Sequence, residues 1–336
     1  MKSFRNSVWV NKWMEILGNF FTEYFIRGRK MKYVNLGNTV IKVPSIIAGC
    51  MRIDSLDVKG VEAFIHNALD CGISYFDHAD IYGNGNCESL MGEALQNMPG
   101  MREKIMIQSK CGIIPGVMYD CSKEHILKSV DESLMRLKTD YLDVLLLHRP
   151  DALIEPEEVA EAFDHLKESG KVKYFGVSNH KPMQIELLKK YCNQPLLINQ
   201  LQLSVTNSYM ITNGLEVNMC TQGSIDRDGS VLDYCRLHDM NIQAWSPFQF
   251  GFFEGIYIGS EKYPKLNEKL NEIGCKYGVS PTSVVTAWIL RHPANIQMIS
   301  GTVKEERLKE IAKGTEFTLT REEWYEIYLA AGKLLP

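Results

Sequence analysis

The sequence contains no Cys-x-x-Cys pair, although it has nine cysteines among its 336 residues. An odd number of scattered cysteines does not fit a disulfide framework, and the absence of close pairs does not fit a zinc ribbon. The plain interpretation is a set of reduced thiols, which predicts a protein of the cytoplasm.

Long apolar runs and a strong excess of one charge are also missing. No run of about 18 apolar residues occurs, so we expect no transmembrane helix. The formal net charge is only −4, which gives no strongly basic surface for nucleic acid. A hydrophobic content of 45% and a charged content of 23% are ordinary for a soluble globular protein.

Residues 1–30 differ from the remainder in charge and pattern. They carry six basic and two acidic residues, and their large apolar residues recur at helical intervals from Val8 to Tyr24. A basic amphipathic helix of this kind can lie on a membrane surface or cover a partner, whereas the cleavage site of a signal peptide is missing. We favour a simpler interpretation, an appended segment, helical or poorly ordered, or sequence upstream of a natural start at Met31. The main domain is then expected over residues 31–336.

Two β-prone runs flank the Gly37-Asn38 turn and predict a β-hairpin near residues 33–43. Beyond it, eight short apolar runs occur at regular intervals. They lie at residues 46–49, 74–77, 105–110, 142–148, 173–178, 196–203, 241–246 and 295–300. Because these runs do not alternate apolar and polar residues, they predict parallel strands that are buried on both faces.

Segments with helical periodicity separate these strand-like runs. Residues 61–69 and 159–166 repeat apolar side chains every three or four positions, and a glycine follows each segment as a stop signal. Ser122 opens a further segment, and Ser280-Pro281 has the pattern of a helix start. Eight strand–helix units predict a (β/α)8 TIM barrel. A doubly wound sheet is the alternative, but no switch point in the middle of the chain is evident.

Four polar residues stand at three consecutive predicted strand ends, where such barrels carry their reactive groups. The second, third and fourth strands end at Asp77, Lys110 and His148, and Tyr82 follows in the loop after the second. An ammonium near a phenol favours the phenolate and lowers the phenol's pKa, and a carboxylate keeps the ammonium charged. This set suits donation of a proton to a carbonyl oxygen that a histidine orients.

Each member taken alone has a simpler explanation, because an aspartate after a strand often caps a helix. A metal-dependent hydrolase is another alternative. Its candidate ligands would be His78, Asp80, His148 and His180. Such sites need several ligands in a regular geometry, and Lys110 among them would repel a cation. We therefore expect no metal site, with His78 and Asp80 as structural neighbours of the reactive groups.

Six pieces of the sequence together resemble the aldo-keto reductase superfamily. In order they are Phe-Asp-His-Ala-Asp-Ile-Tyr-Gly, Ser-Lys-Cys-Gly, Leu-Leu-His-Arg-Pro-Asp, Gly-Val-Ser-Asn-His, Asn-Gln and Ala-Trp-Ser-Pro. The resemblance extends from about Met31 to the C-terminus, and the last piece is similar to bacterial oxidoreductases of the superfamily. It implies Tyr82 as general acid, Lys110 and Asp77 as the groups that tune it, and His148 as the group that orients the substrate carbonyl.

The same resemblance implies a nicotinamide cofactor. The positions that hydrogen-bond the nicotinamide carboxamide are matched by Ser178, Asn179 and Gln200. Trp245 matches the aromatic residue that stacks under the nicotinamide ring, where a tyrosine is usual, and an indole gives a similar flat platform. The stretch from Ser246 to Gly251, with Phe248 in it, matches the loop around the pyrophosphate.

A segment near the C-terminus matches the one that binds the adenosine 2′-phosphate. Thr302 and Arg307 fit phosphate contacts, and Glu310 fits an adenine contact. The lysine often found before Thr302 is Gly301, and the asparagine often found after Glu310 is Ile311. Arg307 still offers a planar fork to a phosphate, so we expect a preference for NADPH, while NADH can also serve.

These features predict NADPH-dependent reduction of a small aldehyde or ketone to the alcohol. The alternative is a cofactor-bound regulatory or partner-binding subunit with little turnover, for which residues 1–30 would be a docking element. Two long connections, residues 205–228 and 248–263, are expected to shape the substrate pocket, and the second is rich in aromatic residues.

Overall fold

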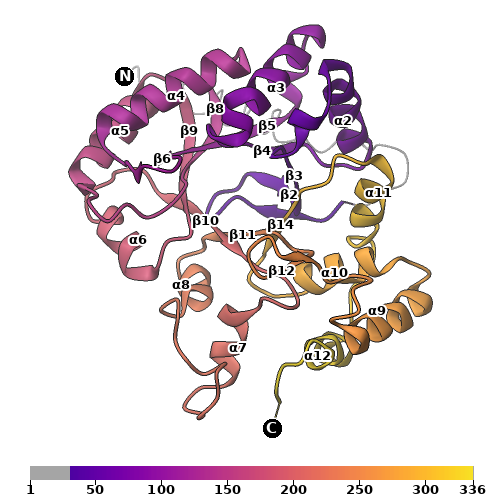
Figure 1. The fold of residues 1–336 in the computed structure, drawn as a ribbon. Coiled ribbons are helices and arrows are strands. Elements are labelled where there is room, and N and C mark those ends of the chain that lie inside the picture. The colour runs from indigo at the N-terminus through magenta and orange to yellow at the C-terminus, as the bar shows by residue number, and fades with distance from the viewer. Residues whose placement is uncertain (1–30, 336) are drawn as a thin grey trace, which may run out of the picture.

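A closed barrel of parallel strands forms the centre of the chain, with helices on its outside (Figure 1). The computed structural model describes residues 31–335. The extension expected over residues 1–30, with its expected helix, lies outside the described residues.

Eight strands close the barrel, and each comes from one of the eight apolar runs. They are β3 (Ile46–Gly49), β4 (Tyr75–Asp77), β5 (Met106–Cys111), β8 (Leu142–Leu147), β9 (Val172–Ser178), β10 (Leu196–Gln202), β11 (Asn241–Trp245) and β14 (Gln297–Ser300). Their order around the barrel follows the chain, and the last strand pairs with the first, Met298 opposite Ile46. The predicted (β/α)8 barrel is therefore confirmed. The doubly wound alternative is wrong, because an open sheet leaves two edge strands and this sheet has none.

Helices cover the outside of the barrel (Figure 1). They are α2 (Val58–Asp70), α3 (Asn86–Asn97), α4 (Lys123–Leu137), α5 (Pro156–Glu168), α6 (Pro182–Lys189), α7 (Tyr209–Leu215), α8 (Val231–Leu237), α9 (Pro264–Tyr277), α10 (Pro281–Leu290), α11 (Glu305–Lys313) and α12 (Arg321–Ala330). Two of them, α4 and α10, begin at the predicted start signals. The Ser122 hydroxyl accepts a hydrogen bond from the backbone N–H of His125, and the Ser280 hydroxyl accepts one from that of Ser283.

An N-terminal β-hairpin lies against the amino ends of the barrel strands. Its strands β1 (Tyr33–Asn35) and β2 (Lys42–Pro44) pair antiparallel, as predicted. In the turn, the Gly37 backbone N–H donates to Asn241 Oδ1, at the start of β11, and Gly37 has a φ of 55°. A side chain at residue 37 would also meet Leu197, so both conformation and space require glycine. The hairpin covers one end of the barrel, and the other end carries the site.

Two further hairpins stand at the carboxyl ends of the strands. The first pairs β6 (Ile113–Ile114) with β7 (Met118–Tyr119), and the second pairs β12 (Gln249–Phe250) with β13 (Gly255–Ile256). The long connections are therefore partly ordered: the first contains α7 and the second contains the β12–β13 hairpin. Among the helices of residues 31–335, none combines the length and the apolar character needed to cross a bilayer.

Candidate active site

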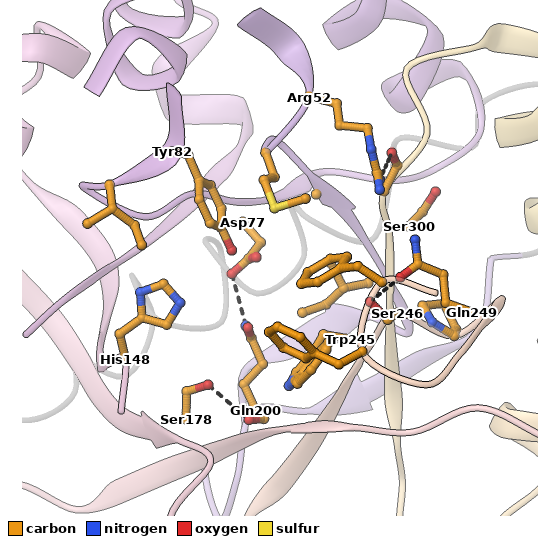
Figure 2. Close-up of a pocket in the computed structure, with 18 of the residues that line it drawn as sticks. Arg52, Asp77, Tyr82, His148, Ser178, Gln200, Trp245, Ser246, Gln249 and Ser300 are labelled. Carbon is orange, nitrogen blue, oxygen red and sulfur yellow. Dashed lines mark hydrogen bonds between the residues drawn. The ribbon is translucent and has the colours of Figure 1, made fainter. Parts of the chain in front are cut away.

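A cavity of about 1180 Å³ lies at the carboxyl ends of the barrel strands (Figure 2). Of the site residues expected from the sequence, the cavity lining contains Asp77, Tyr82, His148, Ser178, Asn179, Gln200, Trp245, Ser246, Phe248, Thr302 and Arg307. Lys110 is fully buried and reaches the site through its bonds to Asp77 and Tyr82. Gly251 and Glu310 are not part of the lining; the Gly251 carbonyl instead accepts a hydrogen bond from Gln202 Nε2 at 2.7 Å.

Lys110 joins Asp77 to Tyr82. Its Nζ donates hydrogen bonds to Asp77 Oδ2 at 2.9 Å, to Tyr82 Oη at 3.0 Å and to the His78 carbonyl at 2.7 Å. These bonds use all three donors of the ammonium group. The strand register explains why the side chains of Lys110 and Asp77 meet. Asp77 in β4 lies opposite Gln108 in β5, and Lys110, two residues further along, points to the same face as Gln108.

Tyr82 begins a tight turn between β4 and α3. This turn, η2 (Tyr82–Gly85), has left-handed backbone at Gly83 and Asn84, with φ values of 56° and 55°. Glycine reaches that conformation without strain, and asparagine tolerates it better than most residues. Helix α3 starts directly afterwards, and its buried Glu88 pairs with Arg136 of α4 at 2.8 Å. The turn is therefore fixed to the outer helices while Tyr82 lines the cavity.

Burial and charge act in opposite directions on Lys110 and Tyr82. Burial opposes the charged ammonium, but Asp77 and Tyr82 outweigh it and raise the pKa of Lys110 above its ordinary value. Burial raises the pKa of Tyr82, and Lys110 offsets only part of that increase. The ammonium therefore lowers the pKa of Tyr82 as expected, but the loss of water around the phenol outweighs it, so the pKa of Tyr82 lies above its ordinary value. The phenol consequently keeps its proton at neutral pH.

His148 follows β8 and stands beside Tyr82, with ring centroids 6.1 Å apart and ring planes at 83°. Figure 2 shows the two rings pointing into the same space. Burial, Lys110 and Arg149 all lower the pKa of His148 well below its ordinary value, so the imidazole is neutral at neutral pH. A neutral imidazole has one N–H to donate, which suits a carbonyl oxygen in the cavity.

His78, Asp80 and His180 remain outside this group. Burial lowers the pKa of His78 to about 3 and that of His180 to about 4. Burial, together with Glu88, raises the pKa of Asp80 to about 7. Within residues 31–335, no group of three or more His, Cys, Asp or Glu side chains is arranged to hold a metal ion.

The ends of β9, β10 and β11 bring polar residues together with Trp245. Ser178 Oγ donates to the Gln200 carbonyl at 3.0 Å, and Asn179 Nδ2 donates to Ser178 Oγ at 2.8 Å. Trp245 Nε1 donates to Asn179 Oδ1 at 3.2 Å, which orients the indole. The indole plane lies nearly parallel to the Phe253 ring, at 24° and with centroids 6.4 Å apart. This part of the cavity thus offers a flat aromatic surface next to hydroxyl and amide groups.

Gln108 and Gln243 were not predicted from the sequence, although they support this site. Both are fully buried inside the barrel. Gln108 Nε2 and Gln200 Nε2 both donate to Asp77 Oδ1, and the second of these bonds is 3.0 Å long. The available signal was a glutamine in a barrel strand, two positions before a site residue (Lys110 or Trp245) and hence on the same face.

Cations gather at the opposite end of the cavity, next to the start of α11. At this end the cavity is lined by Thr302, Lys304 and Arg307. Arg52 Nη1 donates to the Gly301 carbonyl at 2.9 Å, and a Cβ on residue 301 would lie only 2.6 Å from that nitrogen. Within residues 31–335, no ion pair involves Arg52, Lys304 or Arg307. Three cations without acidic partners are thus available to an anionic ligand.

The donors along the cavity fit a dinucleotide cofactor. Hydroxyl and amide groups and an indole stand at one end, and cations stand at the other. Between them, Ser300 at the end of β14 is fully buried, and its Oγ has no hydrogen-bond partner within the described residues. A buried hydroxyl without a partner is costly unless a ligand or water supplies one. The lining therefore agrees with a nicotinamide dinucleotide bound along the strand ends.

Comparisons with known proteins agree with this geometry. The model of the Aldo/keto reductase family matches residues 45–329. The oxidoreductase YcsN of Bacillus subtilis is 39% identical over 298 residues, which cover 85% of this chain and 93% of that protein. A 6-dehydroglucose reductase of Agrobacterium fabrum is 38% identical over 307 residues, which cover 87% of this chain and 96% of that protein.

A solved structure extends the comparison to three dimensions. The thermostable aldo-keto reductase Tm1743, in complex with the inhibitor epalrestat, aligns with a TM-score of 0.72 at 26% identity. The alignment covers 89% of this chain and 100% of that one. The family match, the relatives and the barrel all span nearly the whole described part of the chain. The chain therefore belongs to the aldo/keto reductase family and is an NAD(P)H-dependent oxidoreductase.

Proposed function

We propose that the chain reduces a small aldehyde or ketone to the alcohol, with NADPH as the reductant and Tyr82 as the proton donor. The observation that carries the proposal is the contact of the Lys110 ammonium with both Asp77 and the Tyr82 hydroxyl at the edge of the cavity. A buried, charged group bonded to a phenol in a cleft is typical of a site that moves protons.

The reaction adds a hydride to the carbonyl carbon and a proton to its oxygen. NADPH supplies the hydride when it is bound. Tyr82 donates its phenolic proton to the oxygen, and the negative charge left on the phenol faces Lys110 Nζ at 3.0 Å. Asp77 holds that ammonium in place, 2.9 Å away. The neutral His148 donates a hydrogen bond that orients the oxygen before the proton moves.

The cofactor is assigned to the whole length of the cavity. Trp245 supports the nicotinamide ring, and the neighbouring hydroxyl and amide groups bind its carboxamide. The contacts proposed along the cofactor, from the carboxamide to the adenosine, are Ser178, Asn179, Gln200, Ser246, Phe248, Gly251, Thr302, Arg307 and Glu310. Their support is the cavity itself, whose lining contains all of them except Gly251 and Glu310.

The preference for NADPH rests on the cations at the adenosine end. Arg307 and Lys304 line the cavity and form no ion pair within the described residues, so both are available to a 2′-phosphate. Arg52 adds a third cation next to Gly301, where a lysine side chain is missing. An arginine fork suits a phosphate because it can donate two parallel hydrogen bonds.

The proposed function is tested with a panel of aldehydes and ketones, followed through the absorbance of NADPH. Tyr82→Phe should lower turnover by about 10² to 10⁴-fold while NADPH still binds. Tyr119→Phe is the matched control, since it removes a hydroxyl from the same cavity lining at the exposed β7 position. Retained turnover in Tyr82→Phe would contradict the assignment. Cofactor binding with no turnover of any carbonyl would favour the alternative of a cofactor-bound binding subunit.

The cavity mouth suits a small organic carbonyl. Its two hairpins present exposed apolar side chains, Val117 and Met118 on one side and Phe252 and Phe253 on the other. A location in the cytoplasm is part of the proposal, and its support is that all nine cysteines are free thiols.

A further inference from the structure

A closed ring of four hydrogen bonds lies inside the barrel, below the cavity. Two amide nitrogens, Nε2 of Gln108 and Nε2 of Gln200, alternate around it with two acceptor oxygens, Oδ1 of Asp77 and Oε1 of Gln243. The bonds from Gln108 measure 2.5 Å to Asp77 and 2.9 Å to Gln243, and those from Gln200 measure 3.0 Å and 3.1 Å to the same two atoms. All four residues are buried. Figure 2 shows the bond between Gln200 and Asp77.

Further hydrogen bonds continue from the ring deeper into the barrel. Tyr75 Oη donates to Gln108 Oε1 at 2.8 Å, and Gln243 Nε2 donates to Gln297 Oε1 at 3.3 Å. Gln297 Nε2 donates in turn to the Pro44 carbonyl at 2.8 Å, in strand β2 of the N-terminal hairpin. The orientation of the ring amides is set by Asp77 and does not depend on Gln297. Because a carboxylate can only accept, both Nε2 groups must face it, and the second acceptor of the ring is then the Gln243 oxygen.

The ring reaches the cavity through Asp77 and Gln200 only, since neither Gln108 nor Gln243 lines it. A glutamine amide nitrogen carries two hydrogens, and in Gln200 both are directed to ring acceptors. Gln200 therefore has no side-chain N–H for a ligand and can offer only its Oε1, which is an acceptor.

We infer that Gln243 and Gln108 are positioning residues, which hold the amide of Gln200 and the carboxylate of Asp77 in one hydrogen-bonded ring. The inference rests on the proposed function, in which Gln200 contacts the nicotinamide carboxamide and Asp77 holds Lys110. In that arrangement Gln200 Oε1 would accept a hydrogen bond from an N–H of the carboxamide. The nicotinamide subsite and the proton-delivery group consequently share a single rigid support.

A purely structural role is a poorer explanation of these glutamines. Barrel interiors are normally filled by layers of branched apolar side chains, and a buried amide is costly unless every polar atom is bonded. Three glutamines in the centre of the barrel therefore add little to stability beyond what apolar side chains would give. Two of them, Gln108 and Gln243, instead bond the site residues Asp77 and Gln200 above them.

The test compares two variants and two probes. Gln243→Met removes the acceptor shared by Gln108 and Gln200, and Gln297→Met is the matched control, with the same substitution one step further from the site. The probes are the oxidised cofactor that the wild-type chain binds, NADP⁺ or NAD⁺, and the corresponding fragment without nicotinamide, adenosine 2′,5′-bisphosphate or ADP. Titration calorimetry gives both dissociation constants.

We expect Gln243→Met to weaken binding of the oxidised cofactor about tenfold, because Gln200 loses one of the two bonds that orient it. Binding of the fragment should stay within about twofold in that variant, and Gln297→Met should leave both probes within the same range. Equal weakening of cofactor and fragment, or equal effects of the two variants, would overturn the positioning role.

Gln108→Met provides a second test of the inference if Gln243→Met does not fold. It takes one donor from Asp77 but leaves Gln200 both of its partners. We expect kcat to fall about tenfold while the affinity for the oxidised cofactor stays within about twofold. An unchanged kcat would overturn the inference. Failure of the wild-type chain to bind either oxidised cofactor would overturn the proposed function, and the inference with it.

Discussion

Replacement of Lys110 with methionine removes the central contact of the site while keeping the length of the side chain. The ammonium that bonds Asp77 at 2.9 Å and Tyr82 at 3.0 Å is lost. The buried Asp77 carboxylate then keeps only amide N–H groups as partners. Loss of one member of a buried ion pair typically costs about 3–5 kcal/mol, and we expect the free energy of unfolding to fall by that amount. The phenolate of Tyr82 also loses its counter-charge, so kcat should fall by about 10² to 10⁴-fold.

A double variant separates the two effects. Lys110→Met combined with Asp77→Asn removes both charges, and the asparagine oxygen can still accept the bonds from Gln108 and Gln200. Neutral replacement of a whole buried ion pair is often nearly neutral for stability. Most of the lost unfolding free energy should therefore return in the double variant, whereas kcat should remain low because no ammonium faces Tyr82.

Urea unfolding measures the first effect and NADPH oxidation measures the second. Lys123→Met is the control for removal of a lysine from an ion pair, because Lys123 pairs with Glu161 at 2.7 Å on the exposed surface. Exposed pairs of this kind contribute about 0–1 kcal/mol, so the control should lose little stability and no activity. The reasoning would be refuted if the double variant were as unstable as Lys110→Met alone, or if either site variant kept the kcat of the wild-type chain.

Three further predictions concern the cofactor and pH. Arg307→Gln should lower kcat/KM about tenfold with NADPH and leave it unchanged with NADH; equal efficiency of the wild-type chain with both cofactors would contradict the expected preference. Arg52→Gln should weaken binding of NADPH, and Gly301→Lys added to it should restore that binding, because the lysine takes the space that Arg52 leaves. In the wild-type chain, Gly301→Lys should not improve binding, because Arg52 already fills the space. The dissociation constants of NADPH for the two single variants and the double variant decide this. Burial, with Glu88, raises the pKa of Asp80 from 3.8 to about 7 in the folded chain, so the folded state binds a proton that the unfolded state has released. The free energy of unfolding should therefore fall as pH rises from about 4 to about 7, and Asp80→Asn should flatten that slope in urea titrations; an unchanged slope would refute the assignment.

The barrel, and the meeting of Asp77, Tyr82, Lys110 and His148 around one cavity, were predictable from the sequence for a physical reason. Parallel strands buried on both faces need continuous apolar runs, and the first polar residue after each run marks the strand end. Asp77 and His148 are such residues, whereas Lys110 follows two other polar residues, Gln108 and Ser109. Neighbouring strands bring the three strand ends together without any further information. The direction of the Tyr82 pKa was not predictable in the same way, because it depends on how much water the folded chain removes from the phenol.

The hydrogen-bonded ring was missed because its members are far apart in the chain. Gln108 and Gln243 are separated by 135 positions, and only closure of the barrel brings their amide groups together. From the sequence, each glutamine is one polar residue in a mostly buried strand, which alone indicates neither a partner nor a role. Side-chain networks inside a barrel are therefore not predictable from the sequence, whereas the positions of the strand ends above them are.

Gly301 shows how a departure from a family pattern can be misread without the structure. In the sequence it stands where a lysine is often found, and it indicates a lost positive charge at the adenosine end of the cofactor site. In the structure, the Arg52 guanidinium, 249 positions earlier in the chain, bonds the Gly301 carbonyl and stands 2.6 Å from where a Cβ would be. A side chain at residue 301 would require the exposed Arg52 side chain to move. The glycine therefore leaves room for a cation from another strand end beside Thr302, so the missing lysine does not leave this end of the cavity without a positive charge.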